Sequence, residues 1–180
     1  MLKFLKFAPL LLLALPGLTA AHGPSRQKVE KEIDVGAPPA KVWAVIQDFC
    51  AIEKWHPAIA KCEGEGGNAV GAKRTLTLKG DNPEAKIFEE LSKYDGEKMS
   101  YKYKITKVDV KVLPVTTYAA EITVADNGKG GSTVKWKGGF YRGDTTNNPP
   151  PELSDEAAVK AITGIYDDGL ASIKKLAEGG

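Results

Sequence analysis

The sequence predicts an α+β domain in which a curved antiparallel sheet wraps around a long C-terminal helix, with two short helices after the first strand. Three observations favour this class. Several segments between residues 74 and 140 alternate apolar and polar side chains, as strands with one buried face do. Short turn-forming sequences separate these segments, which indicates an antiparallel meander. From residue 154 onward the apolar residues instead recur at helical spacing.

The first 21 residues are expected to be a cleaved signal peptide. Lys3 and Lys6 form a positive segment, Phe7–Leu18 is apolar, and small residues precede a cleavage site after Ala21. The apolar segment is shorter than the roughly 20 residues that a membrane-spanning helix needs. We therefore expect a periplasmic protein with no membrane span after cleavage.

Residues 22–180 are then long enough for one domain with a hydrophobic core. The whole chain has 25 Lys and Arg residues against 23 Asp and Glu residues, and the two lysines of the leader account for the excess. Net charge therefore gives no indication of nucleic acid or of an anionic membrane as a partner. A charged partner would have to be recognised by a local surface.

The N-terminal half of the domain begins with an expected strand at Lys28–Val35, where apolar and charged residues alternate. Gly36-Ala37-Pro38-Pro39 interrupts it, and a helix can begin there because proline is tolerated in a first helical turn. The buried stripe of that helix is expected to be Val42, Trp43, Ile46 and Phe49. A second helical turn over Ile52–Trp55 is expected to end at His56-Pro57.

A longer series of strands follows, separated by turn-forming residues such as Asp95-Gly96. The expected strands lie at Arg74–Lys79, Ile87–Ser92, Tyr101–Ile105, Tyr118–Val124 and Val134–Phe140. Ser154 then has the position and side chain of a helix N-cap. The apolar face of the terminal helix is expected to be Ala158, Ile162, Ile165, Tyr166, Leu170, Ile173 and Leu176.

Several segments together resemble a known family. They are Val42–Cys62 (VWAVIQDFCAIEKWHPAIAKC), Gly71–Leu78 (GAKRTLTL), Ile87-x-Glu89-x-Leu91, Tyr101-x-Tyr103-x-Ile105 and Tyr166–Leu170 (YDDGL). The chain resembles the START/Bet v 1-like (SRPBCC) superfamily, which has the helix-grip fold and includes the polyketide cyclase/dehydrase group. With its leader it is most similar to MxaD-type proteins, small periplasmic accessory proteins of methanol oxidation.

The resemblance implies an interior cavity between the concave sheet and the terminal helix. The candidate cavity residues are Trp55, His56, Arg74, Glu89, Tyr101, Tyr103, Tyr118, Trp136 and Tyr166. Arg74 and Glu89 share inward parity on neighbouring strands, so they could pair with each other or grip a ligand. The tyrosines could be core residues or could offer hydroxyls to a ligand. Gly164 and Gly169 could allow close helix packing or leave room for a ligand.

The sequence contains no clear motif for a catalytic site or a metal site. His56 has no marked nucleophile beside it, so closing the short helix over the cavity mouth is an alternative to a base role. We assign no catalytic residue, no metal site and no cofactor. Cys50 and Cys62 could form a disulfide in an oxidising compartment or remain two buried thiols.

The lysines of two strands have outward parity, namely Lys102, Lys104, Lys135 and Lys137. They could simply form a solvated face, or they could steer an acidic redox protein toward the domain. The MxaD resemblance implies the second role, assisting the encounter of methanol dehydrogenase with its cytochrome. A non-enzymatic accessory protein is therefore the first expectation, followed by a carrier of a small hydrophobic or amphipathic ligand, then a cyclase- or hydratase-type cavity enzyme.

Overall fold

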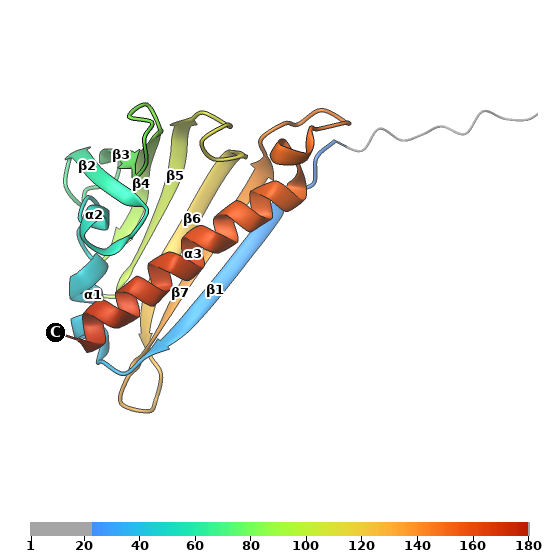
Figure 1. Cartoon of the computed structure of the whole chain (residues 1–180). Helices are drawn as coiled ribbons and strands as arrows, with labels where there is room; N and C mark the ends of the chain where they lie inside the picture. Colours follow the sequence, from blue (N-terminus) through green and yellow to red (C-terminus); the bar gives the residue numbers. More distant parts are fainter. Residues whose placement is uncertain (1–22, 180) are drawn as a thin grey trace, which may run out of the picture.

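The computed structural model describes residues 23–179 and confirms the predicted fold class. A seven-stranded antiparallel sheet in the order β1-β7-β6-β5-β4-β3-β2 curves around α3 (Figure 1). The elements are β1 (Gln27–Val35), α1 (Pro39–Ile46), α2 (Ile52–Trp55), β2 (Ile59–Glu65), β3 (Lys73–Leu78), β4 (Lys86–Asp95), β5 (Ser100–Val108), β6 (Val115–Asp126), β7 (Ser132–Arg142), η1 (Pro151–Leu153) and α3 (Asp155–Glu178). The expected signal peptide lies outside the described residues.

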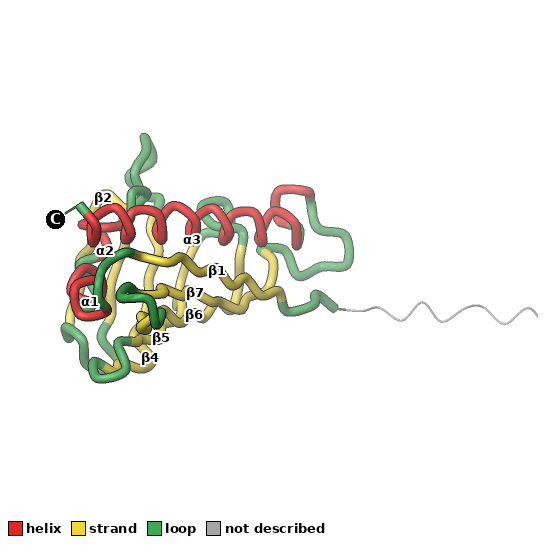
Figure 2. The backbone as a smooth tube through the Cα atoms, turned by 90° about the horizontal axis from the view of Figure 1, so that it is seen from below, coloured by secondary structure: helices red, strands yellow, loops and turns green. Residues whose placement is uncertain are grey.

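The helices lie on one side of the sheet. Seen from below, α3 runs along the sheet, and α1 and α2 lie near its C-terminal end (Figure 2). The apolar faces of α3 and of the strands meet in one core, because each element must bury its apolar face against another. None of the helices in the described part of the chain is long and apolar enough to cross a membrane.

The predicted strands are all present, and β2 is a further strand that the sequence pattern does not predict. In this strand only Ile59 is fully buried, and most of the following side chains are exposed. An edge strand with so little burial carries no clear alternation, so its sequence does not show it. Its pairing with β3 aligns Cys62 with Leu76 and Gly64 with Arg74.

The terminal helix begins as predicted and differs near its end. The Ser154 hydroxyl accepts a hydrogen bond from the Ala157 amide at 3.2 Å, which is the expected N-cap. The prediction that Leu176 belongs to the apolar face is wrong, because its side chain is 44% exposed. Ala177 is buried instead, since the position four residues after Ile173 continues the buried stripe there.

Candidate functional site

A largely apolar cavity of about 280 Å³ lies between the concave face of the sheet and α3. Segments that are far apart in the chain contribute to it, because residues of α2, of six strands (β2 to β7) and of α3 converge there. It is lined by Ile52, His56, Ala58, Ile59, Leu76, Leu78, Ile87, Glu89, Tyr103, Ile105, Val112, Leu113, Tyr118, Trp136, Ala161, Ile162 and Ile165.

Five of the nine predicted cavity residues line it: His56, Glu89, Tyr103, Tyr118 and Trp136. The other four do not line it, which corrects the prediction. They are Trp55, Arg74, Tyr101 and Tyr166, and all are buried. Their side chains pack against neighbours in the core, so inward parity brought them to the right face without giving them access to the cavity.

Most of the lining residues that were not predicted from the sequence are aliphatic. Inward parity on the strands already contained a signal for Leu76, Ile87 and Ile105. Val112 and Leu113 carried no such signal, since they lie in the connection between β5 and β6. Their contribution depends on how that connection folds over the cavity.

A chain of buried hydroxyl groups begins at the cavity wall. The indole nitrogen of Trp136 donates to the Tyr103 hydroxyl at 3.1 Å. The Tyr103 and Tyr118 oxygens lie 3.3 Å apart, and those of Tyr118 and Tyr166 lie 2.7 Å apart. Burial raises the pKa of Tyr103 and of Tyr118 well above the usual value, so these phenols remain protonated.

The far end of this chain is held by ring packing and by a glycine. Tyr166 stacks on Trp136 with the ring centroids 4.4 Å apart and the planes 12° from parallel. A Cβ atom at Gly138 would collide with the Tyr166 hydroxyl. Gly138 therefore leaves the space that lets Tyr166 reach Tyr118.

Arg74 and Glu89 form a buried ion pair, with Nε of Arg74 2.6 Å from Oε2 of Glu89. Arg74 also donates to the Phe49 carbonyl and places its guanidinium 3.9 Å from the centre of the Phe49 ring. Burial raises the pKa of the Glu89 carboxyl above its usual value, and the neighbouring guanidinium offsets part of this rise. The pair interpretation of Arg74 is thus confirmed, and only Glu89 of the two lines the cavity.

Both ring nitrogens of His56 are engaged by backbone groups. The Ala58 amide donates to Nδ1 at 3.2 Å, which requires that nitrogen to be unprotonated. Nε2 lies 3.0 Å from the Ile165 carbonyl and therefore carries the proton and donates. This neutral imidazole ties the segment after α2 to α3, as the closing role predicted, and has no free nitrogen to act as a base.

The buried His56 predicts a pH dependence of stability. Burial lowers its pKa in the folded protein below the usual value of about 6.5. The unfolded chain then binds the proton more readily, so stability should fall as the pH drops below about 6.5, by up to about 1.4 kcal/mol per pH unit. Urea unfolding at pH 7.5, 6.5 and 5.5 measures this slope. His56→Asn should flatten it, and an equal slope in that variant would contradict the assignment.

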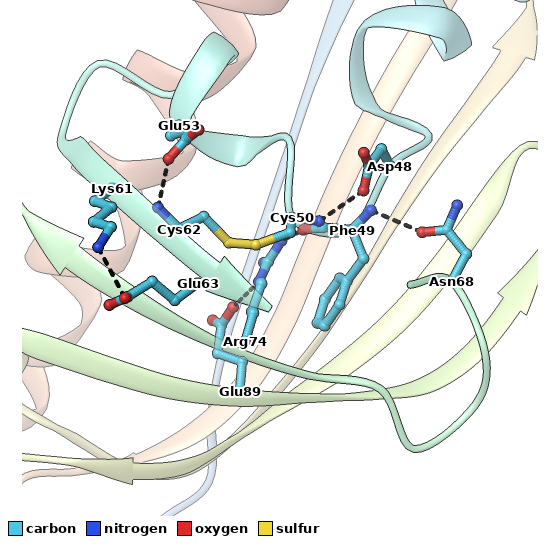
Figure 3. The surroundings of a disulfide bond; sticks show 10 residues. All are labelled: Asp48, Phe49, Cys50, Glu53, Lys61, Cys62, Glu63, Asn68, Arg74 and Glu89. Carbon is cyan, nitrogen blue, oxygen red and sulfur yellow. Dashed lines mark hydrogen bonds and ion pairs between the residues drawn. A yellow bond between two sulfur atoms is a disulfide. The ribbon is translucent and has the colours of Figure 1, made fainter. Parts of the chain in front are cut away.

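Cys50 and Cys62 are joined in a disulfide (Figure 3). It ties the chain between α1 and α2 to β2, beside the buried Arg74–Glu89 pair. The Cys62 amide also donates to the Glu53 carboxylate at 2.6 Å. The loop closed by these links contains four cavity-lining residues, Ile52, His56, Ala58 and Ile59, so the disulfide encloses one wall of the cavity.

Replacing both cysteines should loosen this wall. We expect Cys50→Ala/Cys62→Ala to lower the free energy of unfolding by about 3 kcal/mol, because the bridge restricts the unfolded chain. Amide hydrogen exchange should also accelerate over residues 52–59 more than over β6. Denaturant unfolding and exchange read by mass spectrometry test both expectations. Unchanged exchange in this segment would show that the wall is held without the disulfide.

The outward lysines do lie at the surface, with side chains between 40% and 51% exposed. The expectation that they form a strong local positive field is wrong, because each has an acidic neighbour within 4 Å across the sheet. The pairs are Lys102–Glu121, Lys104–Glu90, Lys135–Glu30, Lys135–Glu32 and Lys137–Glu121. Exposed pairs of this kind contribute little stability, but they cancel the charge of the face.

The glycines of α3 differ in their surroundings. A Cβ atom at Gly169 would lie 2.7 Å from the Trp136 ring and 2.9 Å from that of His56, so close packing explains this glycine. Gly164 has no neighbour within 4 Å of such an atom, and packing does not explain it. Within residues 23–179, no three metal-ligating side chains come together.

Sequence comparison identifies the family. The profile of the family described as polyketide cyclase / dehydrase and lipid transport matches residues 26–178, nearly all of the described chain. The chain belongs to this family. No curated protein matches the chain.

Solved structures support the same assignment. Protein XoxI from Bacillus cereus is 29% identical, with a TM-score of 0.66 and coverage of 82% of this chain and 93% of that chain. An uncharacterized protein from Bacillus thuringiensis is 28% identical, with a TM-score of 0.66 and coverage of 82% and 96%. Norcoclaurine synthase from Thalictrum flavum, in complex with dopamine and hydroxybenzaldehyde, shares the fold at 20% identity, with a TM-score of 0.65 and coverage of 94% and 96%.

The family description covers both enzymes and transport proteins. The side chains at the cavity wall therefore have to indicate which of these two roles the chain can perform. In this polyketide cyclase/dehydrase family member, the polar groups at the cavity wall are one carboxylate, two phenols, an indole and a neutral imidazole. Trp136, His56 and one oxygen of Glu89 are already engaged in hydrogen bonds within the protein. This set can orient a bound molecule through a few hydrogen bonds while aliphatic side chains surround the rest of it.

Proposed function

We propose that this family member binds a small, mainly apolar molecule in the cavity under α3. The observation that carries the proposal is the cavity itself, about 280 Å³ bounded mostly by aliphatic and aromatic side chains. Concave, mostly apolar sites with a few polar groups are the usual form of small-molecule sites. The volume is equivalent to roughly nine water molecules at about 30 Å³ each, so we expect a ligand with on the order of ten non-hydrogen atoms.

A second depression, on the outer face of the sheet, is larger at about 480 Å³. It is a weaker candidate for such a ligand, because it is open to solvent and charged side chains surround it. An apolar molecule gains most where its surface is removed from water, at about 25 cal/mol per Å². The enclosed cavity offers that burial on several sides.

Binding of toluene tests the proposal. Isothermal titration calorimetry or ligand-observed NMR should detect binding to the wild-type protein. Ala161→Leu should abolish it, because Ala161 lines the cavity and the larger side chain fills it. Ala171→Leu is the matched control, since it makes the same change at an exposed position of α3. Absence of toluene binding in the wild type, or equal binding by both variants, would refute the proposal.

We also propose, as a second function, that the protein is exported and assists a periplasmic dehydrogenase–cytochrome pair, as the resemblance to MxaD-type proteins implies. The outer face of the sheet could still attract a charged partner, but through other residues than the four paired lysines. Arg26 and Lys28 border the outer depression and make no ion pair with another described residue. They, rather than the four paired lysines, would supply its attraction for an acidic partner.

Charge reversal tests this second function. Arg26→Glu/Lys28→Glu should slow association with a periplasmic methanol dehydrogenase or its cytochrome by about tenfold at low salt and flatten the salt dependence. Lys129→Glu, in the exposed β6–β7 turn, is the control. Equal association rates for both variants would refute the surface role.

N-terminal sequencing of the periplasmic protein tests export, and a chain that still begins at Met1 would refute cleavage.

A further inference from the structure

The hydroxyl chain at the cavity wall contains one more proton than the protein uses. Tyr103, Tyr118 and Tyr166 each carry one hydroxyl proton. Two hydrogen bonds join their three oxygens, so these bonds consume two of the three protons. The contact between Trp136 and Tyr103 uses the indole proton and so consumes none of them. One hydroxyl proton is left over.

The position of the surplus proton follows from burial. If Tyr166 held it, the proton would face no acceptor among the described residues, and the Tyr166 side chain is 0% exposed. A buried donor without a partner is costly, by about 1–3 kcal/mol. Tyr166 therefore donates to Tyr118, and the surplus proton belongs to Tyr118 or Tyr103. Both of these residues line the cavity, and we infer that whichever hydroxyl holds the surplus proton donates it to a ligand.

Glu89, which lines the cavity, also has a second carboxylate oxygen that can accept a hydrogen bond. Oε2 of Glu89 accepts from Arg74, and no other hydrogen bond engages the Glu89 carboxylate among the described residues. A ligand group that satisfies both features must accept one hydrogen bond and donate another. A hydroxyl group does both with a single oxygen.

We propose that the cavity selects a small aromatic or aliphatic molecule carrying a hydroxyl group, which accepts a hydrogen bond from the Tyr103–Tyr118 pair and donates one to Glu89. This inference rests on the proposed function and names its ligand class. The apolar wall would bind the hydrocarbon part, and the two polar contacts would orient it. A ligand without the hydroxyl leaves these buried groups unpaired, which is the basis of discrimination.

Three probes of nearly equal shape test the selection: toluene, 4-methylanisole and p-cresol. Toluene has no polar group, 4-methylanisole only accepts, and p-cresol both accepts and donates. We expect p-cresol to bind wild-type protein about tenfold or more tighter than toluene, with 4-methylanisole in between. If p-cresol binds no tighter than toluene, the inference is overturned. If p-cresol binds no tighter than 4-methylanisole, the role of Glu89 is overturned.

A variant identifies the donor. Tyr103→Phe/Tyr118→Phe removes both candidate hydroxyls, so the ratio of p-cresol to toluene affinities should fall toward one. Tyr141→Phe, on β7 outside the cavity, should keep the wild-type ratio. A wild-type ratio in the double variant would overturn the assignment, and the three-probe comparison still decides if that variant does not fold. Toluene binding without p-cresol selectivity refutes this inference alone, whereas failure to bind toluene refutes the proposed function.

Discussion

Replacing Trp136 with alanine is expected to lower the free energy of unfolding by about 3–5 kcal/mol. Trp136 is 2% exposed, stacks on Tyr166 and meets Trp55 edge-on with the ring centroids 5.7 Å apart. It also donates to Tyr103. Truncation therefore removes a large apolar group and an aromatic stack at once. It also enlarges the existing cavity that Trp136 lines.

Denaturant unfolding measures this loss, and two variants separate its causes. Trp136→Phe keeps a ring against Tyr166 but loses the indole donor, so its cost should be closer to that of one hydrogen bond, about 1 kcal/mol beyond the lost ring area. Leu176→Ala should change stability by less than about 0.5 kcal/mol, because Leu176 is exposed. A Trp136→Ala loss as small as that of Leu176→Ala would contradict the packing described for β7 and α3.

Arg74→Met should be comparably destabilising, by about 3–5 kcal/mol. The substitution leaves Glu89, which is 5% exposed, without its partner, and it removes the donor to the Phe49 carbonyl. Burying one uncompensated carboxylate is the main cause. The loss should shrink below about pH 5, because an unpaired buried Glu89 binds a proton more readily than the unfolded chain does.

The double variant Arg74→Met/Glu89→Leu tests that explanation. Removing both charges avoids the unpaired carboxylate, so most of the lost stability should return, and only the cost of the unpaired Phe49 carbonyl should remain, about 1–3 kcal/mol. Unfolding curves of the wild type, both single variants and the double variant form the cycle. A double variant less stable than Arg74→Met would show that the pair is not the reason for the loss.

The inward face of the sheet was predictable from the sequence. Strand side chains alternate strictly, so the parity of Leu76, Glu89 and Tyr103 followed from their spacing alone. The same rule placed Arg74 opposite Glu89, and β3 and β4 do align these two residues. Ser154 as N-cap and the stripe from Ala158 to Ile173 followed from local chemistry in the same way.

Which inward residues reach the cavity depended on contacts between distant segments. Tyr101 and Tyr103 have the same parity, but Tyr101 packs with Trp43 and Phe49 from the α1 region, whereas Tyr103 lines the cavity. Parity along one strand carries no information about what covers each position. Parity alone therefore predicts both tyrosines in the cavity, and only Tyr103 lines it.

The outer face shows the same division. Alternation alone determined that Lys104 and Lys137 point to solvent, and their exposure confirms it. Their neutralisation depends on strand register, which aligns Lys104 with Glu90 and Lys137 with Glu121 on the adjacent strands. Local spacing therefore determined, for this protein, which side chains face inward and outward. Only the tertiary structure decided which of them meet, because pairing, packing and cavity access arise between segments that are far apart in the chain.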